Sequence, residues 1–159
     1  MLIRDAEELH KLLSKAFQIE SEYETLAEWE GYISLGNPKY RDLLFELISD
    51  SEKHAAWVKD MLAMVIMPPG YMAPALPPAS FDFKDKSEFD VLMELEKYEQ
   101  LTLDLYSAIK GALARSDLKR MIREGDLEKM LRTLDDLISD ETRHRDAVHS
   151  FVGQVRLIR

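Results

Sequence analysis

The sequence predicts an all-α fold, a bundle of four helices arranged as two hairpins, on three observations. Four long stretches carry apolar residues at spacings of three and four, the period of a helix with one buried face. A proline-rich segment separates the first two stretches from the last two. The segment ISDSEKH at 48–54 returns as ISDETRH at 138–144, which is 90 positions further along the chain. The chain therefore looks like two copies of one helical hairpin.

The first predicted helix spans residues 5–35, where leucines, alanines and other apolar residues alternate with acids at helical spacing. The sequence Gly36-Asn37-Pro38 ends it, and Pro38 suits the first turn of a second helix running from about residue 40 to residue 66. With so short a link between them, the two helices should form an antiparallel hairpin.

A linker is predicted at 68–86, because five of the six prolines fall within it. Such a length of chain can run back along the bundle as a crossover, although a plain link between two small hairpins would have the same composition. We expect one domain over 1–159, made of a first hairpin at 1–67, this linker and a second hairpin at 87–159.

The second hairpin is predicted to begin at Ser87 and Glu88, which start a third helix reaching about residue 113. Ser116 and Asp117 are expected to cap a short extra helix that ends near Gly125. Beyond it, 126–152 has the pattern of a fourth long helix. No stretch shows the alternation of polar and apolar residues that is typical of a strand.

Composition excludes several classes of function. With 159 residues, of which 46% are hydrophobic, the chain suits a single core. A net charge of −9 argues against nucleic-acid binding, which needs clustered basic residues. No apolar run is long enough to span a membrane. The N-terminus becomes acidic at once, unlike a secretory signal, so a cytoplasmic location is expected. Because the chain has no Cys, any bound metal must have oxygen and nitrogen ligands.

The repeated motif contains candidate metal ligands. In the second copy Glu141 and His144 stand three residues apart, which places a carboxylate and an imidazole on one face of a helix. Such a pair can bind a metal ion. The first copy keeps the histidine, His54, but Ser51 stands where a glutamate is expected.

Two further carboxylates are placed by stepping 100° per residue around the other helices. Glu99 falls near the centre of the apolar face of the third helix, whereas Glu96 lies at its flank. Glu20 continues the apolar face of the first helix, whereas Glu24 lies at its margin. We therefore predict that each of the four helices contributes a polar side chain to one buried layer.

This pattern resembles the ferritin-like superfamily and, within it, the rubrerythrin-type domains, in which the first and third helices carry glutamates and the following helices carry E-x-x-H. The spacing from Glu99 to Tyr106 is similar to the third-helix pattern of that group. The resemblance implies metal ligands as follows: Glu20 and Glu99 as terminal carboxylates, Glu141 as a bridging carboxylate, and His54 and His144 as one imidazole for each metal.

The departure from this family lies at Ser51, because serine is neutral and too short to replace a bridging glutamate. Asp50 rotated inward, Glu52 reaching from the side, or water could fill the gap. Alternatively, only one metal binds, beside Glu141 and His144.

The resemblance implies a metal-binding protein that holds iron, as two ions or as one, although manganese or zinc also suits these ligands. It would be an oxidoreductase of a ferroxidase or peroxidase-like kind, oxidising Fe²⁺ or acting on O₂ or peroxide. Lacking cysteine, it would need an external electron donor, and a homodimer is expected. The alternative hypothesis is a helical bundle that has lost the chemistry and serves as a structural or protein-interaction module.

Overall fold

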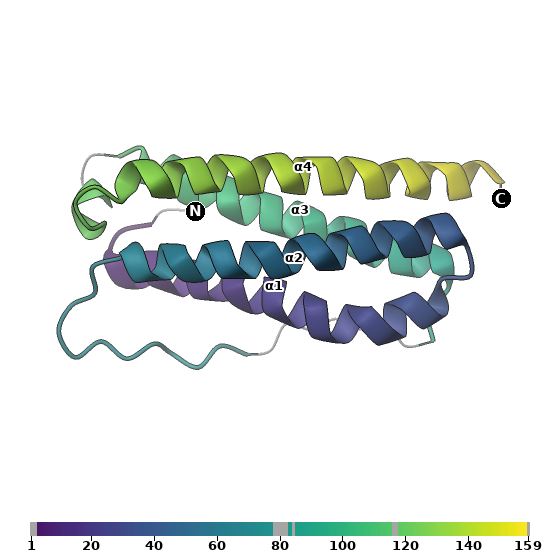
Figure 1. Cartoon of the computed structure of the whole chain (residues 1–159), viewed down its shortest axis with the longest axis horizontal. Coiled ribbons are helices and arrows are strands. Elements are labelled where there is room, and N and C mark those ends of the chain that lie inside the picture. The colour runs from purple at the N-terminus through teal and green to yellow at the C-terminus, as the bar shows by residue number, and fades with distance from the viewer. Residues whose placement is uncertain (1–2, 78–82, 84, 116–117, 159) are drawn as a thin grey trace.

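Four long helices lie side by side in one bundle in the computed structural model of the chain (Figure 1). It describes residues 3–77, 83, 85–115 and 118–158, except for the side chains of 23–33, 118, 119 and 155–158. The helices are α1 (Ala6–Ser34), α2 (Pro38–Met64), α3 (Glu88–Leu113) and α4 (Leu127–Ile158), with a short 3-10 helix, η1 (Leu118–Met121), before α4. The predicted all-α, four-helix fold is confirmed, and the predicted boundaries of α1 to α3 lie within about two residues of those observed.

Local sequence signals start two of the helices. Asn37 caps α2, because its side chain accepts a hydrogen bond from the backbone N–H of Lys39 at 3.0 Å, and Pro38 follows in the first turn. Ser87 caps α3 in the same way through the N–H of Asp90, at 3.2 Å. The caps expected at Ser116 and Asp117 lie outside the described residues.

Helix α1 packs mainly against α2, and α3 packs mainly against α4. The connection from α2 to α3 follows the length of α1, as the described residues on either side of 78–82 show (Figure 1). Its contacts, in chain order, are Tyr71 with His10, Pro77 with Gln18, Phe83 with Ser34, and Glu88 with Asn37. The last contact brings the start of α3 to the start of α2, so these two helices begin at the same end of the bundle.

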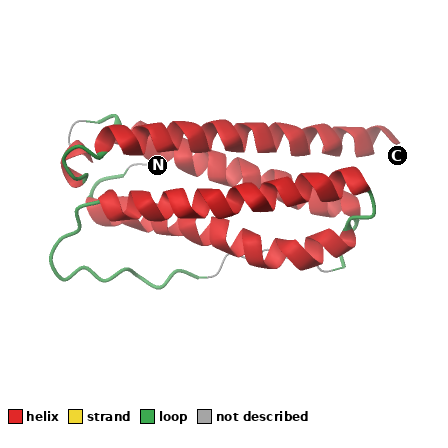
Figure 2. Cartoon of the chain, in the orientation of Figure 1, coloured by secondary structure: helices red, strands yellow, loops and turns green. Residues whose placement is uncertain are grey.

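The remaining connections are loops and turns (Figure 2). Among the described residues there is no strand, and the one β-type pairing joins Val65, just after α2, to Ile122, just after η1. Within the residues that the structure describes, no helix combines the length and the apolar character needed to cross a bilayer.

The buried apolar side chains form two clusters. One cluster contains Leu44, Leu92 and Val148, and the other contains Leu13, Ile109 and Leu134. Between them lies a layer of buried polar side chains contributed by all four helices, namely Glu20, Ser51, His54, Glu99, Thr102, Glu141 and His144. Since burying carboxylates without partners is costly, this layer is the part of the core that requires an explanation beyond packing.

Candidate metal centre

All five residues predicted as metal ligands lie in the buried polar layer, and none is more than 5% exposed. Helix α1 contributes Glu20, α2 contributes His54, α3 contributes Glu99, and α4 contributes both Glu141 and His144. Each occupies the middle of the apolar face of its helix, where the 100° rotation places it. The structure therefore brings the five side chains together, while their binding of metal stays a prediction.

These residues form two groups that share one member. Glu20, His54 and Glu141 offer ligand atoms that lie within 4.8 Å of one another, and so do Glu99, Glu141 and His144. Each group supplies carboxylate oxygen and imidazole nitrogen, a donor set that suits iron, manganese or zinc. Glu141, which the family resemblance implies as the bridging carboxylate, is the residue common to both groups.

Both histidines present the same ring nitrogen to the centre. His54 Nε2 lies 3.2 Å from Asp140 Oδ2, and His144 Nε2 lies 2.9 Å from Asp50 Oδ2. With the aspartates as acceptors, each Nε2 carries a proton and each Nδ1 faces the carboxylates inside. A metal-binding histidine usually donates its second ring N–H to a carboxylate in this way, which fixes the ring orientation.

The inward nitrogen of His54 lacks a regular partner. Nδ1 lies 2.8 Å from Glu141 Oε1 and 3.7 Å from Glu20 Oε1, distances that allow ion pairs. Even so, it forms no hydrogen bond of normal geometry with any described residue. A completely buried nitrogen that is directed at two carboxylates without a well-aligned hydrogen bond is the arrangement that a cation between them would satisfy.

Burial and charge together shift the pKa values of this layer. Burial alone would lower the pKa of His54, but Glu141 and Glu20 outweigh it and raise that pKa to about 10. Burial raises the pKa of Glu20 and of Glu141, although His54 acts in the opposite direction on both. Without metal, a protonated His54 therefore supplies positive charge between the carboxylates.

Two buried hydroxyls fix the carboxylates from the side of α3. The hydroxyl of Tyr106 donates to Glu20 Oε1 at 2.6 Å, and that of Thr102 donates to Glu141 Oε2 at 2.7 Å. Burial, followed by the charge of Glu20, raises the pKa of Tyr106, so the phenol remains a donor. Each glutamate is thus oriented by one hydrogen bond.

Around the two histidines, charged residues form a closed network. Lys53 Nζ lies 3.0 Å from Asp50 Oδ1 and 2.9 Å from Asp140 Oδ2, and Arg143 lies 2.8 Å from Asp50 and 3.5 Å from Asp140. Partial burial alone would raise the pKa of Asp50, but hydrogen bonds from His144, Lys53 and Arg143 hold it well below its usual range. The network keeps both aspartates ionised as acceptors.

Sequence reasoning missed the role of these aspartates, although the repeat contains the signal for it. Asp50 and Asp140 are equivalent positions of the two copies, as are Lys53 and Arg143. Each aspartate contacts the histidine of the other copy. A search for all polar residues kept at a displacement of 90, rather than for ligands alone, would have found them.

The outcome at Ser51 is clear for two of the three predicted substitutes. Asp50 is held by His144 on the outer side of the centre, and Glu52 is exposed. Neither carboxylate reaches the place beside Ser51. Ser51 itself lines a small cavity, together with Glu20, Glu99 and other residues of the layer.

Glu96 and Glu24 are the two acids that the sequence places at the edges of the apolar helix faces rather than at their centres. Glu96 points away from the layer and contacts the exposed His149 at 2.5 Å, in agreement with the choice of Glu99. The side chain of Glu24 lies outside the described residues.

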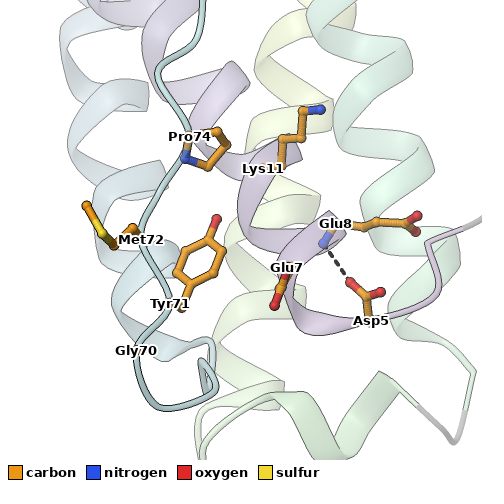
Figure 3. Close-up of a pocket in the computed structure, with 8 residues that line it drawn as sticks. All are labelled: Asp5, Glu7, Glu8, Lys11, Gly70, Tyr71, Met72 and Pro74. Atoms are coloured by element: carbon orange, nitrogen blue, oxygen red, sulfur yellow. Dashed lines mark hydrogen bonds between the residues drawn. The ribbon is translucent and has the colours of Figure 1, made fainter.

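A larger hollow, of about 510 Å³, lies at the surface between the start of α1 and the segment that follows α2 (Figure 3). Its acids include Asp5, whose Oδ1 accepts a hydrogen bond from the N–H of Glu8 at 2.8 Å and so caps the first turn of α1. Because helix capping accounts for Asp5 and no imidazole lines the hollow, the buried layer is the better candidate for a functional site.

Comparison with protein-family models, with curated proteins and with solved structures finds no match to this chain.

Proposed function

We propose that this protein binds two divalent metal ions in the buried polar layer. Glu20 and His54 would hold one ion, Glu99 and His144 the other, and Glu141 would contact both. The observation that carries this proposal is the sharing of Glu141 between two buried groups that each contain one imidazole. The aspartate behind each histidine adds support, since it directs Nδ1 towards the carboxylates of the layer, which is Glu141 for His54 and Glu99 for His144.

The same proposal places the chain among the ferritin-like proteins of the rubrerythrin type. Two features support it beyond the ligand pattern. The four helices pack as two pairs, and the long connection lets α2 and α3 begin at one end of the bundle. Ferritin-like bundles use one long crossover of this kind, whereas simple up-and-down bundles have short loops throughout.

Iron is the metal we propose first, with manganese and zinc as alternatives that the same ligands suit. Bound iron would supply two-electron chemistry with O₂ or peroxide, or Fe²⁺ itself would be the substrate of oxidation. The residues of the chain would bind and orient the ions, offset most of their positive charge with three carboxylates, and exclude bulk water through the two apolar clusters. Electrons would come from an external donor, because the chain has no cysteine for an internal iron–sulfur or rubredoxin-type centre.

A second candidate function is a structural or interaction module without metal. One observation favours it: His54, with its raised pKa, already pairs with Glu20 and Glu141 and so compensates buried charge from within. The neutral Ser51 at the position of the expected bridging glutamate agrees with such a loss of metal chemistry.

Metal content per chain distinguishes the two functions. Protein purified without a metal-affinity tag and reloaded with Fe²⁺ under anaerobic conditions should contain about two ions per chain by elemental mass spectrometry. The variant Glu141→Gln should lose most of this metal, because one neutral amide would replace the carboxylate shared by both groups. Glu96→Gln is the matched control, since Glu96 lies outside the two ligand groups and contacts the exposed His149. No bound metal, or equal loading of the Glu141 variant, would overturn the metal proposal.

A further inference from the structure

Two surface hollows adjoin at the start of α1. One, of about 510 Å³, lies between the first turns of α1 and the segment 70–74 (Figure 3). The other, of about 560 Å³, lies between the same part of α1 and the segment 66–69. Asp5 and Glu7 line both hollows, which together are called the α1 groove below. About 20 Å of helix separates Glu7 from Glu20, so the groove is distinct from the buried polar layer.

One wall of the α1 groove carries apolar side chains that the fold leaves exposed. Met72 is 87% exposed and Ile66 is 50% exposed. Met67, Pro68 and Met121 line the same surface beside Ile66. Methionine is flexible and polarisable, so it adapts to the shape of an apolar partner. Apolar side chains gathered in a surface hollow indicate an interaction site, whereas single exposed ones need no such explanation.

The other wall is acidic. Asp5, Glu7 and Glu8 line the groove, and Lys11 alone is basic among the described residues that do so. The start of the helix accounts for two of these acids, because Asp5 accepts the N–H of Glu8 and Glu8 accepts a backbone N–H of the preceding turn. Glu7 is exposed and pairs with no basic residue of the described chain. Its charge is therefore available to a cationic partner.

Charge and shape together select the kind of partner. Carboxylates repel nucleic acids and anionic membranes, so the partner is a basic protein segment. A strand would need a sheet edge, but among the described residues the one β-type pairing joins Val65 to Ile122. A polyproline segment would need several aromatic side chains, and Tyr71 is the single aromatic residue lining the groove. A helix that places apolar side chains in a groove is the remaining common mode.

We propose that the α1 groove docks a basic amphipathic helix of another protein. The apolar face of that helix would cover Met72 and Ile66, and its lysine or arginine side chains would lie beside Glu7. The two walls of the groove offer the matching surfaces, one apolar and one acidic. The inference goes beyond the proposed function and requires no bound metal.

The probe is a synthetic peptide of about 18 residues with leucines along one helical face and lysines along the other. Fluorescence anisotropy of the labelled peptide, titrated with the full chain, should show a saturable one-to-one complex with Kd below about 100 µM at low ionic strength. Added salt should weaken it. A peptide of the same composition in scrambled order, and one with glutamate in place of lysine, should each bind at least about tenfold more weakly.

Two variants with matched controls locate the binding surface. Met72→Ser should weaken binding about tenfold to a hundredfold, because this exposed side chain becomes buried in the complex. Phe45→Ser is its control, since Phe45 is 70% exposed and lines neither hollow. Glu7→Lys should weaken binding about twofold to thirtyfold by replacing attraction with repulsion. Asp136→Lys makes the same change of charge at an exposed site outside both hollows.

Binding that falls in Met72→Ser and Glu7→Lys, but not in the two controls, would support the docking site. No saturable binding, equally tight binding of the scrambled peptide, or equal losses in the controls would overturn it. Self-association of the chain that Met72→Ser abolishes and Phe45→Ser preserves would also overturn it, by assigning the groove to a second copy. Metal content is measured on the same samples, and a wild type without metal would overturn only the proposed function.

Discussion

The metal-free protein should lose stability as the pH is raised from 6.5 to 9, because of His54. The pKa of this imidazole is about 10 in the folded protein and 6.5 in the unfolded chain. Since the folded value is the higher one, the stabilisation is complete below pH 6.5 and is lost as the pH rises towards 10. Across the window the folded state keeps its proton while the unfolded state releases one.

The size of the effect follows from proton linkage. One proton bound only by the folded state costs about 1.4 kcal/mol of stability per pH unit once the unfolded histidine has titrated. Between pH 6.5 and 9 the loss amounts to about 3 kcal/mol for a folded pKa near 10. Burial also raises the pKa of Glu20 and Glu141, which contributes a loss of the same sign.

Urea denaturation, followed by circular dichroism in the presence of a chelator, measures this change directly. His54→Asn is the control, because asparagine cannot titrate, and its free energy of unfolding should depend much less on pH across the window. The slopes are compared rather than the absolute stabilities, since the substitution itself alters packing. A wild-type stability that does not fall with pH, or an equal slope in the variant, would refute the assignment of a raised pKa to His54.

Three further changes have defined outcomes. Tyr106→Phe removes the hydrogen bond to the buried Glu20 and should lower the free energy of unfolding by about 1 to 3 kcal/mol in urea denaturation; no loss would mean that this bond is dispensable. Leu44→Ala in the fully buried core should cost about 2 to 5 kcal/mol by the same assay, and a cost below about 1 would contradict close packing there. Asp140→Asn should release the ring of His54 and reduce metal content towards about one ion per chain; full loading would refute an orienting role for this aspartate.

Much of the fold could be predicted from the sequence because its signals are local. Helical periodicity, the cap at Ser87 and the proline at position 38 each act within a few residues, and the observed helices follow them closely. The five residues expected as ligands could also be located, since a position at the centre of an apolar helix face has one direction in which to point.

The contacts between helices could not be predicted in the same way. Asp50 contacts His144 on the outer side of the layer and does not reach the place beside Ser51. The periodicity of α2 cannot predict this contact, because it depends on how α2 and α4 are rotated relative to each other. The hydrogen bond between Tyr106 and Glu20 likewise joins residues 86 positions apart. Such pairings follow from packing of the whole bundle.

The exchange of aspartates between the two halves of the repeat has a consequence for folding. The contacts of Asp50 with His144 and of His54 with Asp140 span 94 and 86 residues, so each histidine takes the acceptor for its Nε2 from the other helical hairpin. Contacts of such long sequence separation carry a large loop-closure cost and form only when distant segments dock. A single hairpin that paired with a second copy of itself would need the same exchange of aspartate–histidine contacts between the two copies. In the present chain, the Nε2 contacts of both imidazoles should therefore form only when the two hairpins dock.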